Sequence, residues 1–165
     1  MSEKPEALLR AEEIEKADEI KVQHPLNPRS EVYIRSMSEL VGMTRVGVHV
    51  ARLPPGKESM EFHAHHYEEE FLYILSGRGT ADIDGQEVEV HPGDFLGFKV
   101  PSVGHNLRNP FDEDLVYLMG GERREFEIAD FPRLNKRLIR DRQKAYVVHL
   151  GDLDVFDLGD VKEYR

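Results

Sequence analysis

The chain contains no cysteine, and this absence removes several kinds of chemistry at once. Without thiols there is no disulfide framework, no thiolate zinc site, no iron–sulfur cluster and no cysteine nucleophile. Any metal ion must therefore be held by nitrogen and oxygen ligands. The lack of cysteine also favours an intracellular protein.

Positive charge is in the minority, with 22 Lys and Arg against 32 Asp and Glu, so that the formal net charge is -10. A surface of this sign repels phosphate backbones, and nucleic acid is not an expected partner. No apolar run approaches the roughly 18 residues that a membrane helix needs. The first residues, MSEKPEALLRAEEIEK, are too acidic for a signal or transit peptide. We therefore expect a cytoplasmic protein that does not insert into a membrane.

The length of 165 residues suits one domain with a sizeable core. A short amphipathic helix is predicted over residues 5–20, where small and apolar side chains recur every third residue, at Leu8, Ala11, Ile14 and Ala17. The prolines of HPLNPR, residues 24–29, mark a link to the segment that follows. We predict residues 1–30 as an N-terminal helix and linker, and residues 31–165 as one β domain with a C-terminal extension.

From residue 44 the pattern changes to the two-residue period of a half-buried strand, with Val46, Val48 and Val50 alternating with other side chains. Short runs of this kind continue to residue 121 and are separated by turn signals. Asp84-Gly85, between TADID and QEVEV, predicts a two-residue hairpin loop, because a type I′ turn needs positive φ at both positions. Short, evenly spaced strands without intervening helices indicate an all-β antiparallel sandwich or barrel, with its core motifs in residues 44–121.

The segment after residue 121 is dense in charge. Residues 122–144 hold the main basic cluster, from Arg133 to Arg142, which we interpret as a solvated surface rather than a binding patch. AYVVHL, residues 145–150, predicts one more strand, and an acidic tail follows it.

Three of the eight histidines fall within one decapeptide, FHAHHYEEEF. His63 and His65 are two residues apart, so on a strand their imidazoles point to the same side. After a turn, a strand running back antiparallel would begin with Glu70, whose carboxylate would join them, and the distant His105 would add a third imidazole. Three imidazoles and a carboxylate suit Mn, Fe, Co, Ni or Zn, and an octahedral ion held by them keeps two positions open.

Isolated histidines carry less weight than this cluster. We interpret His24, His49, His91 and His149 as ordinary surface or hydrogen-bonding residues. Buried imidazoles and a carboxylate are different, because each buried polar group without a partner costs about 1–3 kcal/mol. A divalent metal would remove that cost, so the cluster favours a metal site.

The stretch from Pro54 to Asn109 resembles the cupin family through two spaced motifs. The first pairs a glycine with His-x-His, a glutamate and a second glycine, and the matching residues are Gly56, His63, His65, Glu70 and Gly77, with the first gap one residue longer than usual. The second is matched by Gly85, Pro101, Gly104, His105 and Asn109, with the proline one residue closer to the histidine. The longer segments are similar to single-domain bacterial cupins, some of which carry provisional labels as sugar-phosphate isomerases.

This resemblance implies a double-stranded β-helix, the cupin jelly roll, with one divalent metal on His63, His65, Glu70 and His105. It also implies a pocket around the ion, lined by Leu72, Ile74, Phe98 and Met119. Phe71 and Tyr73 would face the other side of their strand, where cupins often pack against a second subunit, and a homodimer is expected.

Two classes of function follow from these expectations. The first is an enzyme for a small oxygen-rich substrate, either isomerase-like, with the metal stabilising an enediolate or oxyanion, or dioxygenase-like, with Fe(II) and dioxygen. No dedicated general base stands out, and Glu69, His66 and Lys99 are the candidates. The alternative is a non-catalytic small-molecule-binding or sensor module. Residues 1–30 are too short and acidic for a helix-turn-helix DNA reader, which lowers the expectation of a regulator.

Overall fold

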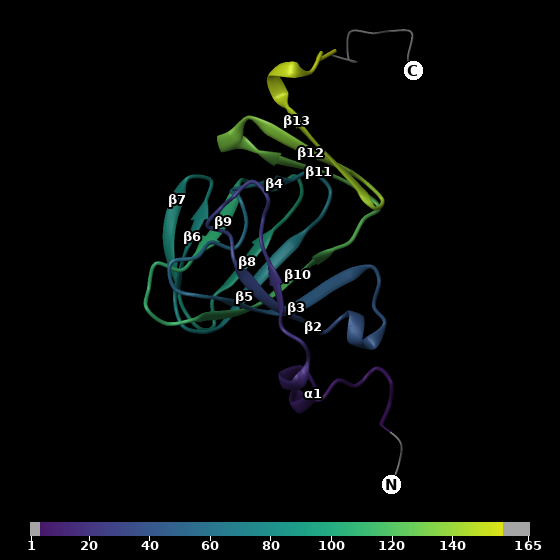
Figure 1. Cartoon of the computed structure of the whole chain (residues 1–165), viewed down its shortest axis with the longest axis vertical. Helices are drawn as coiled ribbons and strands as arrows, with labels where there is room; N and C mark the ends of the chain where they lie inside the picture. Colours follow the sequence, from purple (N-terminus) through teal and green to yellow (C-terminus); the bar gives the residue numbers. More distant parts are fainter. Residues whose placement is uncertain (1–3, 157–165) are drawn as a thin grey trace.

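Three antiparallel sheets build the computed structural model of the chain, which describes residues 4–156 (Figure 1). The largest sheet has six strands in the order β1-β2-β3-β10-β5-β8. Its strands are β1 (Ile20–Val22), β2 (Val32–Ser36), β3 (Val46–Leu53), β5 (Glu70–Ser76), β8 (Phe95–Phe98) and β10 (Leu115–Glu122). The all-β jelly-roll prediction is confirmed.

Two smaller sheets complete the fold. The three-stranded sheet, β7-β6-β9, consists of β6 (Gly79–Ile83), β7 (Gln86–Val90) and β9 (His105–Arg108). The four-stranded sheet, β13-β12-β11-β4, consists of β4 (Ala64–His65), β11 (Phe126–Phe131), β12 (Lys136–Asp141) and β13 (Lys144–His149). Helical segments are short: α1 (Ala11–Lys16) and the 3-10 turns η1 (Glu39–Val41), η2 (Pro132–Leu134) and η3 (Leu150–Asp152). In Figure 1, α1 and β13 lie at opposite ends of the molecule.

The core lies between the six-stranded and three-stranded sheets. Leu53, Ile74 and Leu115 of the large sheet are fully buried, and Leu107 of β9 is 2% exposed. Burying a side chain of this size contributes about 1.5–3 kcal/mol. The large number of such side chains makes the barrel wall a rigid frame for the groups that point into it.

The hairpin predicted at Asp84-Gly85 is confirmed between β6 and β7. Ile83 pairs with Gln86, so the loop has two residues. Asp84 and Gly85 have φ values of 53° and 81°, the left-handed backbone that a type I′ turn requires. A local sequence signal was sufficient here, because the turn geometry depends only on these two residues.

The strand predicted from residue 44 is confirmed as β3, but the valines do not form its buried face. Ala51 and Leu53 point into the core, whereas Val46 is 37% exposed on the outer face. A two-residue period separates the faces of a strand without saying which one the other sheet covers. The outer face of β3 therefore carries Val46, Val48 and Val50.

The N-terminal helix is shorter than predicted. Only Ala11–Lys16 is helical, and no residue of the helix is buried. A helix this short gains little without a covered apolar face, so the predicted range of residues 5–20 is wrong at both ends. Ile20–Val22 forms β1 instead, which pairs with β2 at the edge of the large sheet.

The charged segment after residue 121 was interpreted as a solvated surface, and this is wrong for β11. Glu127, Ala129 and Phe131 of that strand are buried at 1%, 7% and 3% exposure. The basic cluster that follows is partly exposed, with Arg142 at 73%. β13 confirms the strand predicted over residues 145–150, and the acidic tail beyond residue 156 lies outside the described residues.

No helix within residues 4–156 has the length and apolar character that crossing a bilayer demands.

Candidate metal centre

Two histidines of the decapeptide share one direction, as their spacing predicts. His63 exchanges two backbone hydrogen bonds with His105 of β9, with N···O distances of 3.1 and 2.8 Å. His65 lies two residues after His63, in β4, where it pairs with Ala129 of β11. The Nε2 atoms of His63 and His65 are 3.1 Å apart, and both rings face the interior between the sheets.

Glu70 and His105 complete the group. The Oε2 atom of Glu70 lies 3.1 Å from Nε2 of His105, 3.5 Å from Nε2 of His65 and 3.8 Å from Nε2 of His63. The candidate ligand atoms of His63, His65, Glu70 and His105 all lie within 4.8 Å of one another. The structure thus brings together the four residues named from the sequence.

The strand pairing that brings Glu70 to the cluster differs from the prediction. The strand of Glu70 was expected to run back beside the strand of His65, but β5 pairs with β10 and β8, whereas β4 pairs with β11. The connection between β4 and β5 crosses from one sheet to another, so the ligands meet across the barrel interior. The prediction of neighbouring strands is wrong because β4 is only two residues long and its partner is distant in sequence.

The Nδ1 atom of each of the three imidazoles lies near an oxygen atom that can accept a hydrogen bond. Nδ1 of His63 lies 2.8 Å from the carbonyl oxygen of Glu61, and Nδ1 of His105 lies 3.0 Å from that of Val103. Nδ1 of His65 lies 3.3 Å from a carboxylate oxygen of Glu127. Carbonyl and carboxylate oxygens accept hydrogen bonds, so we assign the hydrogen of each ring to Nδ1 and a lone pair to Nε2.

These tautomers decide what the centre can hold. Three Nε2 lone pairs and one carboxylate face one another, four acceptors without a donor, and such a set repels itself unless a cation occupies the centre. A proton or a metal ion serves that purpose. Imidazole and carboxylate ligands in this number suit a divalent transition metal, so the residues present fit such an ion.

The pKa directions agree with this electrostatic picture. Burial lowers the pKa of His63 below its ordinary value of 6.5. Burial also acts to lower the pKa of His65, but its contacts with Glu70 and Glu127 outweigh this and raise it. Burial acts to raise the pKa of Glu70, yet the neighbouring imidazoles of His105, His63 and His65 hold it well below the usual 4.5. The centre therefore contains a carboxylate charge that attracts a cation.

An apolar wall closes the inner side of the centre. The ring of Phe98 stacks on that of His105 with centroids 3.7 Å apart. A cavity of about 30 Å³, enough for one or two waters, lies beside the cluster and is lined in part by Leu72, Phe98 and Met119. Three of the four predicted lining residues are thus at the site, whereas Ile74 lies deeper in the core at 0% exposure.

Tyr117 is a functional candidate that the sequence analysis missed. It is 1% exposed and lines the same small cavity. Burial, together with the charge of Glu70, raises the pKa of Tyr117, so the phenol keeps its proton as a potential donor. A signal existed, because Tyr117 alternates with Met119 in LVYLM on the face predicted to point inward.

A wider pocket of about 160 Å³ opens on the other side of the cluster. His65, Glu70 and Met119 form its floor, and His49 and Arg123 lie among its walls. His49, interpreted as an ordinary residue, points inward from β3 and accepts a hydrogen bond from Arg123 at 3.3 Å. Its second ring nitrogen is buried and unpartnered within residues 4–156. A small polar molecule entering this pocket would meet both groups.

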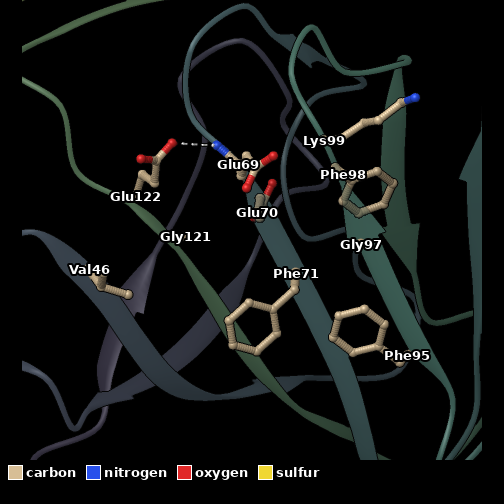
Figure 2. Close-up of a pocket in the computed structure, with 10 residues that line it drawn as sticks. All are labelled: Val46, Glu69, Glu70, Phe71, Phe95, Gly97, Phe98, Lys99, Gly121 and Glu122. Carbon is tan, nitrogen blue, oxygen red and sulfur yellow. Dashed lines mark hydrogen bonds between the residues drawn. The ribbon is translucent and has the colours of Figure 1, made fainter.

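Of the three candidate general bases, Glu69 lines the pocket of about 160 Å³ together with His65 and Glu70, whereas His66 and Lys99 do not line it. His66 contacts Asp130 at 2.9 Å rather than the cluster. Glu69 and Lys99 line a groove of about 430 Å³ on the outer side of β5 and β8. Figure 2 shows Lys99 directed away from Glu70. The backbone N–H of Glu69 donates to Glu122 at 3.2 Å, the dashed line in Figure 2.

Known proteins share this fold and these motifs. A family model described as "Cupin domain" matches residues 49–121. The "Putative sugar phosphate isomerase" of Acidithiobacillus ferrooxidans is 37% identical, with a TM-score of 0.90 over 92% of this chain and 97% of that chain. A sugar phosphate isomerase of Silicibacter pomeroyi has a TM-score of 0.77 over 90% of this chain and 96% of that chain, at 22% identity, which shows the fold alone.

Curated relatives match over shorter stretches. The oxalate-binding protein of Thermotoga maritima is 36% identical over 67 residues, 41% of this chain and 54% of that protein. The chain spans about half the length of the curated relatives it matches, between 46% and 54% of each. The family model, the full-length structural relative and the two spaced histidine motifs agree, and the chain belongs to the cupin family.

Proposed function

We propose that the chain binds one divalent transition metal on His63, His65, Glu70 and His105 and acts as an isomerase-like enzyme on a small oxygen-rich molecule. The observation that carries this proposal is the meeting of three imidazole nitrogens and one carboxylate at one point inside the barrel. An ion held there would supply Lewis-acid stabilisation of negative charge on substrate oxygens. The name of the Acidithiobacillus ferrooxidans relative supports a phosphorylated sugar as the substrate class.

The residues around the centre fit a small substrate. The pocket of about 160 Å³ is smaller than the 300–1,000 Å³ typical of drug-sized ligands, so it suits a molecule of few heavy atoms or one end of a longer one. The phenol of Tyr117 lines the cavity of about 30 Å³ on the inner side, where it would donate a hydrogen bond to a substrate oxygen bound at the centre itself. The wall formed by Leu72, Phe98 and Met119 would exclude water and strengthen the electrostatic interactions.

Hydrogen exchange tests the proposed reaction. The protein, loaded separately with Mn²⁺, Fe²⁺, Co²⁺, Ni²⁺ or Zn²⁺, is incubated in D₂O with a panel of aldose and ketose phosphates, keto acids and diols. We expect at least one substrate to exchange a carbon-bound hydrogen next to a carbonyl, measured by proton NMR, and Tyr117→Phe to slow this exchange about 10- to 1,000-fold.

Parallel measurements separate the competing functions. Oxygen consumption that needs Fe²⁺ and disappears under anaerobic conditions, without hydrogen exchange, would replace the isomerase with a dioxygenase. Tight binding of a panel member with neither exchange nor oxygen uptake would identify a binding or sensor module. A protein that takes up none of the five metals would refute the proposed centre itself.

We also propose that a second copy of the chain covers the outer face of the large sheet. Phe71 and Phe95 stack there with centroids 5.9 Å apart, and Figure 2 shows both rings below Glu70 on the outer side of β5 and β8. Phe95 is 65% exposed, and Tyr73 and Leu75 beside it are 39% and 41% exposed. A continuous apolar face of this kind marks an interaction surface, and the sign of the net charge disfavours a nucleic-acid occupant.

The oligomeric state tests this assignment. We expect sedimentation equilibrium to give twice the 19.0 kDa chain mass for the wild type and the single mass for Phe95→Glu. Val88→Glu is the matched control, because Val88 is 50% exposed on β7 of a different sheet. A wild-type monomer, or a dimer that Phe95→Glu leaves intact while Val88→Glu disrupts it, would contradict the assignment.

A further inference from the structure

Glu127 is a buried carboxylate in the middle of a segment that is otherwise dense in exposed charge. Its exposure is 1%, the lowest of any acidic residue among the buried polar groups of residues 4–156. One of its oxygens accepts the backbone N–H of His66 at 3.0 Å, and the other accepts that of Tyr67 at 3.1 Å. The carboxylate therefore fixes the turn that follows β4, directly after a candidate metal ligand.

Glu127 differs from its buried neighbour Glu68 in the ionisable groups that each carboxylate contacts. Glu68 forms an ion pair with Arg140 and accepts the backbone N–H of Arg124 at 2.5 Å. Within the described residues, Glu127 forms no ion pair with a lysine or arginine, and its ionisable partner is Nδ1 of His65 at 3.3 Å. A buried carboxylate is costly without partners, and Glu127 is stabilised by the two backbone N–H groups and by the Nδ1–H group of His65.

This contact acts on His65 in a defined way. Because the carboxylate accepts from Nδ1, the lone pair of His65 is on Nε2 and faces Glu70. A carboxylate behind an imidazole fixes its orientation and increases its basicity toward a metal on the opposite nitrogen. The backbone adds a second constraint, since Ala129, two residues after Glu127, pairs with His65 in the sheet.

His65, Glu68 and Glu127 also lie close enough to one another to suggest a separate cation site. The hydrogen bonds argue against it. Glu68 is neutralised by Arg140, and both oxygens of Glu127 already accept backbone N–H groups. We therefore do not assign a second cation site to these three residues, and we interpret Glu68 and Glu127 as neighbours that support the metal centre.

We propose that Glu127 is the positioning residue of the metal centre, and that the β11–β13 extension of the barrel is thereby part of the centre. The inference rests on the proposed metal site. It assigns a role to a residue outside the segment that the family model covers, residues 49–121. The extension supplies this role through one side chain and one strand pairing.

Glu127→Gln tests the proposal because it keeps an oxygen for the backbone amides and removes the charge. We expect the affinity for Co²⁺, measured by competition with a chelator, to fall about 10- to 100-fold, with a changed visible spectrum of the bound Co²⁺. Asp130→Asn is the matched control: Asp130 lies on the same strand and contacts His66, which is outside the cluster. Its affinity and spectrum should match those of the wild type.

A second measurement tests the inference on the metal-free protein, without relying on metal affinity. In the metal-free protein, ¹⁵N NMR of the histidine rings should show the hydrogen of His65 on Nδ1, and Glu127→Gln should shift this ring's nitrogen signals more than those of His63 or His105. Wild-type protein that binds no Co²⁺ would refute the metal site. Wild-type protein that binds it, with Glu127→Gln binding equally well, would overturn only the role of Glu127, as would a His65 ring without hydrogen on Nδ1.

Discussion

Replacing His63 and His65 together with alanine is expected to abolish metal binding while the β-sheet circular dichroism spectrum is retained. Two of four ligands are lost, so the affinity should fall by more than about 100-fold, the upper value for losing a single supporting partner of a ligand. The fold should survive, because the change removes two of four mutually repelling acceptors rather than a packed apolar side chain. Elemental analysis after expression with added metal measures the effect.

The control for this double variant replaces two histidines that lie outside the cluster. His91 and His149 are both exposed, His91 at 58%, and their replacement by alanine should leave about one ion per chain. If metal content stays equal in the two double variants, the ion is held elsewhere. If the His63 and His65 variant unfolds even without metal, the cluster serves stability rather than binding.

Gly77→Ala is expected to destabilise the protein by about 2–5 kcal/mol, which would lower the melting temperature by roughly 5–20 °C. Gly77 follows β5 with φ of 73°, a left-handed conformation that costs a side chain about 1–2 kcal/mol. An added Cβ would also lie 2.2 Å from the carbonyl oxygen of Asp114, so the two chain segments must separate. Thermal unfolding followed by circular dichroism measures the loss.

Gly85→Ala separates the two causes of this loss. Gly85 has φ of 81°, but an added Cβ there would meet no atom within 4 Å. Only the backbone cost of about 1–2 kcal/mol should therefore appear. Equal losses in the two variants would show that the contact between Gly77 and Asp114 does not limit stability, and that the motif glycine serves only the turn.

Sequence patterns with a local cause predicted their structures well. The Asp84-Gly85 hairpin follows from the φ values of two adjacent residues. The inward face of β5, with Glu70, Leu72 and Ile74, follows from the alternation of successive side chains along one strand. The predicted helix over residues 5–20 failed, because its length depends on whether another element covers its apolar stripe, and none of its helical residues is buried.

The amino-acid sequence by itself determined which four side chains are candidate ligands, because their types and spacings place imidazoles and a carboxylate on inward strand positions. Only the tertiary structure decided that β4 pairs with β11, that the valines of β3 face outward, and that Glu127 stands behind His65. Strand pairing joins residues far apart in sequence, such as His65 and Ala129, and a two-residue period is the same whichever face is covered. Tertiary packing therefore determines which residues lie next to a side chain. The position of the residue in the sequence determines only which side of the strand it shares with its neighbours at i±2.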